Sequence, residues 1–220
     1  MEKCWLLDEG CSGIDCNTFC LKRYKLEKLF DMALLTQKQR EKIKFKPDSD
    51  KDKENFEYLS TINKNINNFV NQGGNLYIYS PLLGNGKTSW SLRFIQTYLK
   101  NIWYTSELKC RALFINVPRF LLALKATISE KDEYAEYIKS NVLEADLVVW
   151  DEIGTKGLTQ FEHENILSFI NARVDAGKAN VYTSNLNGKE LCSVVGDRLY
   201  SRVVLLSDRV ELNGSDRRAL

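Results

Sequence analysis

The chain has 220 residues, of which 44% are hydrophobic, enough for one medium-sized domain with a buried core and a small appendage. Its formal net charge of +2 gives no chain-wide attraction for nucleic acid, so such binding would depend on a local patch. No apolar run approaches the roughly 20 residues that span a bilayer, and the N-terminus does not resemble a signal peptide. We therefore expect a cytoplasmic protein with no membrane partner.

The first 20 residues hold a cluster of cysteines, namely Cys4, Cys11, Cys16 and Cys20. Four thiolates can form a tetrahedral zinc site, which would hold together a segment too short to build its own core. The spacing C-x6-C-x4-C-x3-C is wider than that of ordinary zinc fingers. We favour zinc, with an iron–sulfur cluster or no metal as alternatives. A disulfide is less favoured, because disulfides are rare in the cytosol.

Three zones follow one another along the chain. Residues 1–35 combine the cysteines with a stretch whose apolar residues fit one helical face. Residues 36–57 are charged and almost free of aliphatic side chains, which is typical of a linker or a solvated surface segment. From residue 58 to residue 220, helical patterns alternate with short apolar runs.

The third zone has the pattern of an α/β fold. We expect helices over 58–72, 87–102, 118–142 (interrupted near Ser129), 160–176 and 197–205. We expect strands over 75–79, 112–117, 146–150, 179–184 and 209–212. Apolar strands that alternate with helices predict a parallel sheet covered on both faces, in three αβα layers.

The loop after strand 75–79 has the composition of a phosphate-binding loop, Gly84-Asn85-Gly86-Lys87-Thr88, with Ser89 next. Glycines let backbone N–H groups converge on phosphate oxygens at a helix N-terminus. Lys87 would reach the β- and γ-phosphates of ATP, and the Thr88 hydroxyl would bind Mg²⁺. Pro81 replaces the first glycine of the usual pattern, but the later residues form the cradle, so we expect binding to survive. The alternative is a chance glycine-rich turn.

Two further strands end in polar residues that suit the same chemistry. Asp151 and Glu152 follow the apolar run LVVW, where an acidic residue can hold Mg²⁺ and its neighbour can polarise a water. Asn185 follows VYTS, where an amide can contact the γ-phosphate or orient that water. The alternative in both cases is that polar residues simply terminate a strand.

Arg198 and Arg202 are four positions apart in GDRLYSRV, so a helix would place them on one face. The planar guanidinium of arginine suits phosphate and can act on the nucleotide of a neighbouring subunit. The alternative is a solvated face paired with Asp197 or another neighbour. We favour the phosphate role for Arg202 and leave both interpretations open for Arg198.

Five segments in a fixed order carry a family resemblance: GNGKTSW, VVWDEIG, NARVDAGKANVYTSN, GDRLYSRV and GSDRR. Together they resemble the DnaC/DnaI-type helicase loaders, AAA+ P-loop ATPases that have compact bacteriophage versions. The resemblance covers about residues 58–220 and implies an AAA+ αβα core. Because Leu220 lies just past the last segment, we expect the C-terminal lid to be reduced or absent.

The resemblance also implies roles for single residues. Lys87 and Thr88 would bind nucleotide and magnesium, Asp151 and Glu152 would hold magnesium and activate water, and Asn185 would be sensor 1. Arg202 would be the trans-acting finger, and Arg218 would be sensor 2, with Arg217 as the alternative.

By the same resemblance, residues 1–35 would dock a replicative DnaB-type helicase, and the chain would form a homo-oligomer that contacts single-stranded DNA. The leading hypothesis is therefore ATP-dependent loading of a ring helicase in phage DNA replication. One alternative is a transposition helper ATPase of the IstB type, which shares the same core. Another is an adaptor that binds nucleotide and helicase without hydrolysis.

Overall fold

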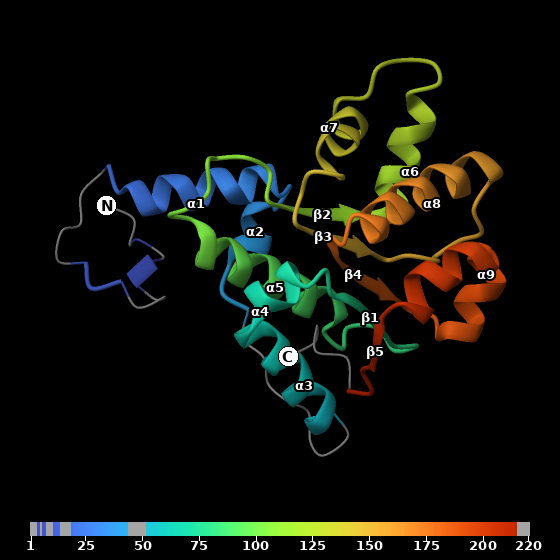
Figure 1. The fold of residues 1–220 in the computed structure, drawn as a ribbon, viewed down its shortest axis with the longest axis horizontal. Helices are drawn as coiled ribbons and strands as arrows, with labels where there is room; N and C mark the ends of the chain where they lie inside the picture. The colour runs from blue at the N-terminus through green and yellow to red at the C-terminus, as the bar shows by residue number, and fades with distance from the viewer. Residues whose placement is uncertain (1–3, 5, 8–10, 14–18, 44–51, 215–220) are drawn as a thin grey trace.

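The computed structural model describes residues 4, 6–7, 11–13, 19–43 and 52–214. A single five-stranded parallel sheet, in the order β2-β3-β4-β1-β5, forms its centre (Figure 1). The strands are β1 (Asn75–Tyr79), β2 (Ala112–Asn116), β3 (Leu147–Asp151), β4 (Ala179–Ser184) and β5 (Asp208–Glu211). Because every strand is parallel, all carboxyl ends meet at one edge of the sheet, where ligands bind in such folds.

Helices cover both faces of the sheet (Figure 1). One face carries α1 (Leu21–Met32), α3 (Lys53–Lys64), α4 (Ile66–Asn71) and α5 (Lys87–Ile102), with the short α2 (Gln37–Arg40) beside them. The other carries α6 (Val117–Ala126), α7 (Glu133–Asn141), α8 (Gln160–Asp175), α9 (Gly188–Tyr200) and the π-helical turn η2 (Ser201–Leu205). Ile78 packs with the first group, whereas its neighbour Tyr77 packs with the second. This alternation confirms the three-layer αβα prediction.

Helix boundaries follow from local capping. Asn116, Thr159 and Asn187 accept hydrogen bonds from the backbone at the starts of α6, α8 and α9. Gly177, with φ of 64°, follows α8 in the left-handed conformation that often ends a helix.

Two predicted helices are wrong in their bounds. The single helix expected over 58–72 is two helices, because Asn65 has non-helical φ and ψ and its side chain bonds to the Thr61 carbonyl. The short helix expected over 197–205 is part of a longer one that begins at Gly188. It kinks at Gly196, where φ is 78° and ψ is 163°, and continues into η2.

The N-terminal helix shares the core of the sheet. Leu26, Leu29 and Phe30 on α1 are buried in the same hydrophobic cluster as Phe94 of α5. The Phe114 N–H of β2 also donates to the Ala33 carbonyl at 3.0 Å. Packing is thus continuous from α1 to the sheet. Within the part of the chain that the structure describes, no helix has the length and apolarity to cross a bilayer.

Candidate functional site

The loop between β1 and α5 is shaped by two glycines with positive φ, 71° at Gly84 and 105° at Gly86. Gly86 is the N-cap of α5, and a Cβ added to it would meet no atom within 4 Å. Its backbone conformation, and not crowding, therefore favours glycine there. The loop brings the N-terminus of the 16-residue α5, with its partial positive charge, to the carboxyl edge of the sheet.

The ammonium of Lys87 lies inside this loop. Its Nζ donates to the carbonyl oxygens of Ser80 (3.2 Å) and Leu82 (2.9 Å) and to Asn85 Oδ1 (3.3 Å). The side chain is only 9% exposed, and these oxygen atoms compensate its loss of water. A buried cation beside a turn of backbone N–H groups suits an anion with several oxygens, such as a phosphate chain.

Asp151 ends β3 and is 4% exposed. Its Oδ1 accepts hydrogen bonds from Thr88 Oγ1 (3.0 Å) and Thr183 Oγ1 (2.7 Å). Burial raises the pKa of Asp151, and the bonds from Thr183 and Thr88 partly offset that rise. A carboxylate and a hydroxyl oxygen this close together are the ligands that Mg²⁺ prefers, so the pair fits a divalent cation.

Glu152 is exposed and has a φ of +62°, which for a residue other than glycine costs on the order of 1–3 kcal/mol. Its backbone N–H donates to Thr183 Oγ1 (3.0 Å), which helps to hold this conformation. Its Oε2 accepts a hydrogen bond from Asn116 Nδ2 (3.0 Å). Backbone strain of this kind recurs at functional sites, and here it gives two adjacent carboxylates different surroundings.

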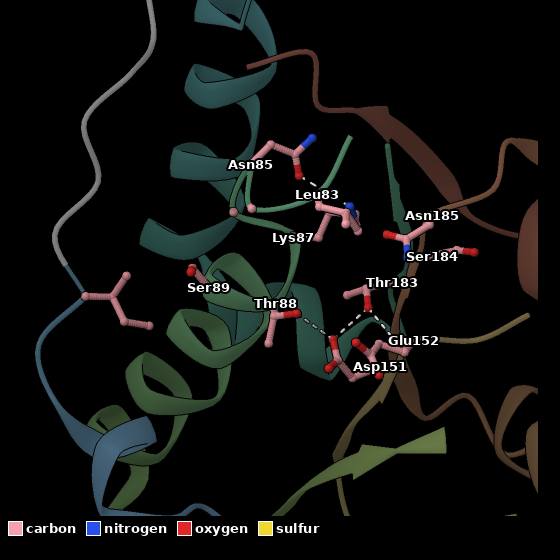
Figure 2. Close-up of a pocket in the computed structure, with 13 residues that line it drawn as sticks. Leu83, Asn85, Lys87, Thr88, Ser89, Asp151, Glu152, Thr183, Ser184 and Asn185 are labelled. Carbon is pink, nitrogen blue, oxygen red and sulfur yellow. Dashed lines mark hydrogen bonds between the residues drawn. The ribbon is translucent and has the colours of Figure 1, made fainter. Parts of the chain in front are cut away.

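A cavity of about 500 Å³ joins these elements. Figure 2 shows the Lys87, Asp151 and Glu152 side chains, which come from α5 and the end of β3, around it. It is lined by Ile43, residues 83–89, Asp151, Glu152 and residues 183–185. The predicted cofactor-binding residues Gly84, Asn85, Gly86, Lys87, Thr88 and Ser89 therefore lie together with Asp151, Glu152 and Asn185.

Residues 18–218 match the model of a family described as IstB-like ATP binding protein. The chain belongs to the IstB-like ATP-binding family. A comparison with curated proteins found no match. The cavity combines a glycine-rich loop, a buried lysine and two adjacent carboxylates, which agrees with membership of an ATP-binding family.

Several solved structures have a fold similar to that of this chain. The DnaC helicase loader matches with a TM-score of 0.62 and 18% identity, over 77% of this chain and 94% of that one. DnaI matches with a TM-score of 0.61 and 16% identity, over 84% and 94%. The initiator DnaA bound to AMPPCP and single-stranded DNA also gives 0.61 and 16%, over 82% and 51%. The chain therefore has the αβα P-loop fold of these proteins.

Neither Arg198 nor Arg202 lines this cavity. Arg202 lies on η2, where its Nε donates to Asn171 Oδ1 of α8 at 2.7 Å, and it does not line the cavity. Arg198 is exposed on α9. Arg218 and its alternative, Arg217, lie outside the described residues.

The structure gives the zinc prediction no support. Cys4, Cys11 and Cys20 are free thiols, and Cys16 lies outside the described residues. No three or more His, Cys, Asp or Glu side chains among the described residues are placed to hold a metal ion. Cys4 and Cys20 instead pack against the hydrophobic cluster that contains α1.

Among the residues at the site that the sequence did not predict are Thr183, Asn116 and Ile43. The Thr183 hydroxyl donates to Asp151 and accepts from the Glu152 N–H. In the sequence, a hydroxyl residue near the end of the strand before Asn185 could have indicated it. Asn116 pairs in register with Asp151 on the adjacent strand, and its signal was an asparagine just before a predicted helix. Ile43 gave no signal, because only the folded chain brings the segment before α3 to the cavity.

Proposed function

We propose that this IstB-like family member is an ATPase that loads a DnaB-type replicative helicase onto single-stranded DNA in phage DNA replication. The observation that carries the ATPase part is the convergence of Lys87, Thr88, Asp151 and Glu152 on one cavity. The loader part is supported by the likeness to the solved DnaC helicase loader, which extends over 94% of the chain in that structure.

In the proposed reaction, the N–H groups of residues 84–88 and the Lys87 ammonium bind the triphosphate. Thr88 and Asp151 would hold Mg²⁺, which when bound offsets negative charge on the phosphates. Glu152 orients a water and takes its proton as the water attacks the γ-phosphorus. The bond to the β–γ bridging oxygen breaks, which gives ADP and phosphate, and Asn185 contacts the γ-phosphate.

A homo-oligomer completes the proposed site. Arg202 does not line the cavity of its own chain, so it would contact the nucleotide of a neighbouring subunit as a trans-acting finger. Arg218 would contact the nucleotide of its own chain as sensor 2. ATP binding would stabilise the oligomer, and hydrolysis would release the helicase.

Helicase docking is assigned to residues 1–35. The support is an exposed apolar surface on α1, where Leu21 is 61% exposed and Tyr24 is 53% exposed. Single-stranded DNA is the proposed second partner, because the similar DnaA structure holds single-stranded DNA together with AMPPCP.

Steady-state ATP hydrolysis, measured with and without single-stranded DNA, tests the ATPase part. Glu152→Gln should lower the hydrolysis rate about 100-fold or more and leave ATP affinity within about threefold, because the base acts only in the chemical step. The control Glu130→Gln, at an exposed carboxylate that does not line the cavity, should behave as the wild type. A wild-type chain that binds ATP but hydrolyses none would favour the non-hydrolysing adaptor.

The family description favours one other function, that of a transposition helper of the IstB type. The two functions require different partners. Pull-down of the ATP-bound chain with a DnaB-type helicase and, separately, with a transposase separates them. Capture of the helicase alone supports the loader, and capture of the transposase alone overturns it.

A further inference from the structure

Asn85 is buried, although it lies in a loop that faces the cavity. Its side chain is 2% exposed and stands between two glycines with positive φ. A phosphate loop needs only the backbone N–H of such a residue for phosphate. A buried amide, however, must find hydrogen-bond partners inside the protein, and the identity of these partners indicates its role.

Both ends of the Asn85 amide are engaged. Its Nδ2 donates to Ser80 Oγ and to the Leu212 carbonyl oxygen, the latter at 2.8 Å. Its Oδ1 accepts from Lys87 Nζ at 3.3 Å, the contact drawn in Figure 2. Since the Leu212 carbonyl only accepts and the ammonium only donates, chemistry fixes the orientation of the amide. One side chain thus touches the phosphate-binding lysine and a strand end that is 127 residues away along the chain.

Leu212 belongs to a firmly held backbone segment just after β5. Its N–H donates to the Tyr79 carbonyl (2.9 Å), which extends the pairing of β5 with β1. The next N–H, that of Asn213, donates to Asp52 Oδ1 (2.7 Å), immediately before α3. A shift of Asn85 would therefore act on a point at which β1, the segment after β5 and the start of α3 meet.

We infer that Asn85 is a positioning residue, which orients Lys87 for the triphosphate and couples the phosphate loop to residues 212–213. This inference rests on the proposed ATP site. A triphosphate would replace the Ser80 and Leu82 carbonyls on the Lys87 ammonium, because charge-assisted bonds are the stronger ones, and the contact with Asn85 would keep the ammonium in place. The bond from Asn85 to the Leu212 carbonyl then ties the occupied loop to the segment after β5. Nucleotide binding therefore stabilises that segment, and the segment in turn strengthens nucleotide binding.

The test uses the full chain and the variants Asn85→Ala and Asn85→Asp, with Ser80→Ala as the matched control. Asn85→Ala loses both the contact with Lys87 and the bond to the Leu212 carbonyl. Asn85→Asp keeps an oxygen for Lys87 but has no N–H for the Leu212 carbonyl. Ser80→Ala removes one bond to Asn85, together with the bond from the Leu82 N–H to Ser80 Oγ, and leaves the contacts of Asn85 with Lys87 and Leu212 in place. Calorimetry measures ATP affinity, and amide hydrogen exchange at saturating AMPPCP measures protection of residues 210–213.

Asn85→Ala should weaken ATP binding about tenfold, the equivalent of one lost hydrogen bond to a charged or buried group. In the wild type and in Ser80→Ala, AMPPCP should slow exchange at residues 210–213, whereas in both Asn85 variants it should not. A merely structural role would change exchange in β2 and β3 as well. ATP affinity within twofold of wild type, together with unchanged protection of residues 210–213, would overturn the inference alone. A wild-type chain that takes up no ATP would overturn the proposed function with it.

Discussion

Pro81 stands where phosphate loops ordinarily have their first glycine, and the structure places it outside the lining of the cavity. The cavity is lined by residues 83–89 and not by Pro81. The two positive φ angles that shape the turn lie at Gly84 and Gly86. The proline ring fixes φ at a position just after β1, and this restriction does not affect the residues that line the cavity.

Pro81→Gly should therefore leave ATP affinity within about threefold of the wild type, because no contact to the cavity changes. It should lower the free energy of unfolding by about 0.4–1 kcal/mol, because glycine adds conformational freedom to the unfolded chain. Calorimetry with ATP and urea denaturation measure the two quantities. Gly86→Ala is the contrasting variant, since its φ of 105° is one that alanine rarely adopts. Equal ATP affinities for these two variants would contradict the argument.

At the scale of elements, Asn116 connects a helix to a carboxylate. Its Oδ1 accepts from the Arg119 N–H (3.1 Å) as the N-cap of α6, while its Nδ2 donates to Glu152 (3.0 Å). The position of Glu152 thus depends on how α6 begins. A displacement of α6 by a bound partner would act directly on the group that we assign to water activation.

Two substitutions separate these roles. Asn116→Ala should cost about 1 kcal/mol of stability through loss of the cap, whereas Asn116→Asp keeps a capping oxygen and should cost little. Both lose the N–H that holds Glu152, so both should lower kcat about tenfold with KM unchanged. Denaturation and steady-state kinetics give the comparison. A wild-type kcat in Asn116→Asp would mean that the bond to Glu152 has no part in hydrolysis.

Glu162 joins three elements through one buried carboxylate, which is 1% exposed. Its Oε1 accepts from Lys125 of α6 and Lys156 of the loop after β3, each at 3.2 Å, and its Oε2 accepts from Thr159 at the start of α8. Burial alone would raise the pKa of Glu162. The bonds from Thr159, Lys125 and Lys156 outweigh burial and lower the pKa to about 2.

Because this pKa is depressed on folding, the contribution of Glu162 to stability is fully present above the unfolded pKa of about 4.3. It is lost as the pH falls from there towards about 2. Glu162→Gln should therefore destabilise the chain by about 2 kcal/mol at pH 7, and that difference should shrink below about pH 4.3. Urea denaturation at several pH values measures it. The exposed Glu164→Gln, on the same helix, is the control, and a difference that does not vary with pH would contradict the assignment.

The same scale shows how far the sequence could lead. Strand positions and the acidic pair at the end of β3 were predictable, because apolar runs and glycine turns are local signals. The break at Asn65 and the kink at Gly196 were not, since tertiary packing decides whether a helical pattern continues. The place of Ile43 depends on Gln96, whose side chain donates to the carbonyls of Gln39 (2.7 Å) and Glu41 (3.2 Å). No pattern along the chain indicates a contact of that kind.

At the scale of the whole molecule, Arg202 does not line the cavity that holds the other residues of the proposed active site. The phosphate loop and carboxylates line the cavity, whereas Arg202 is fixed to α8 through Asn171. An assembly that unites them must pair one surface with the other, in a heterologous, head-to-tail contact. Such contacts close into rings or continue into filaments, and in our proposal both would place each Arg202 beside a neighbour's nucleotide.

Mixing two inactive variants tests this arrangement. Arg202→Ala keeps an intact nucleotide site but loses the arginine finger. Lys87→Ala keeps the finger but loses the lysine that would bind the phosphates. Each variant alone should therefore hydrolyse ATP at about 1% of the wild-type rate or less. In an equimolar random mixture, about one interface in four joins an intact cavity to an intact finger, so about a quarter of the activity should return. Arg198→Ala in place of Arg202→Ala shows whether the other arginine of the pair contributes. If both variants join the oligomer in native mass spectra and no activity returns, the finger does not act between subunits.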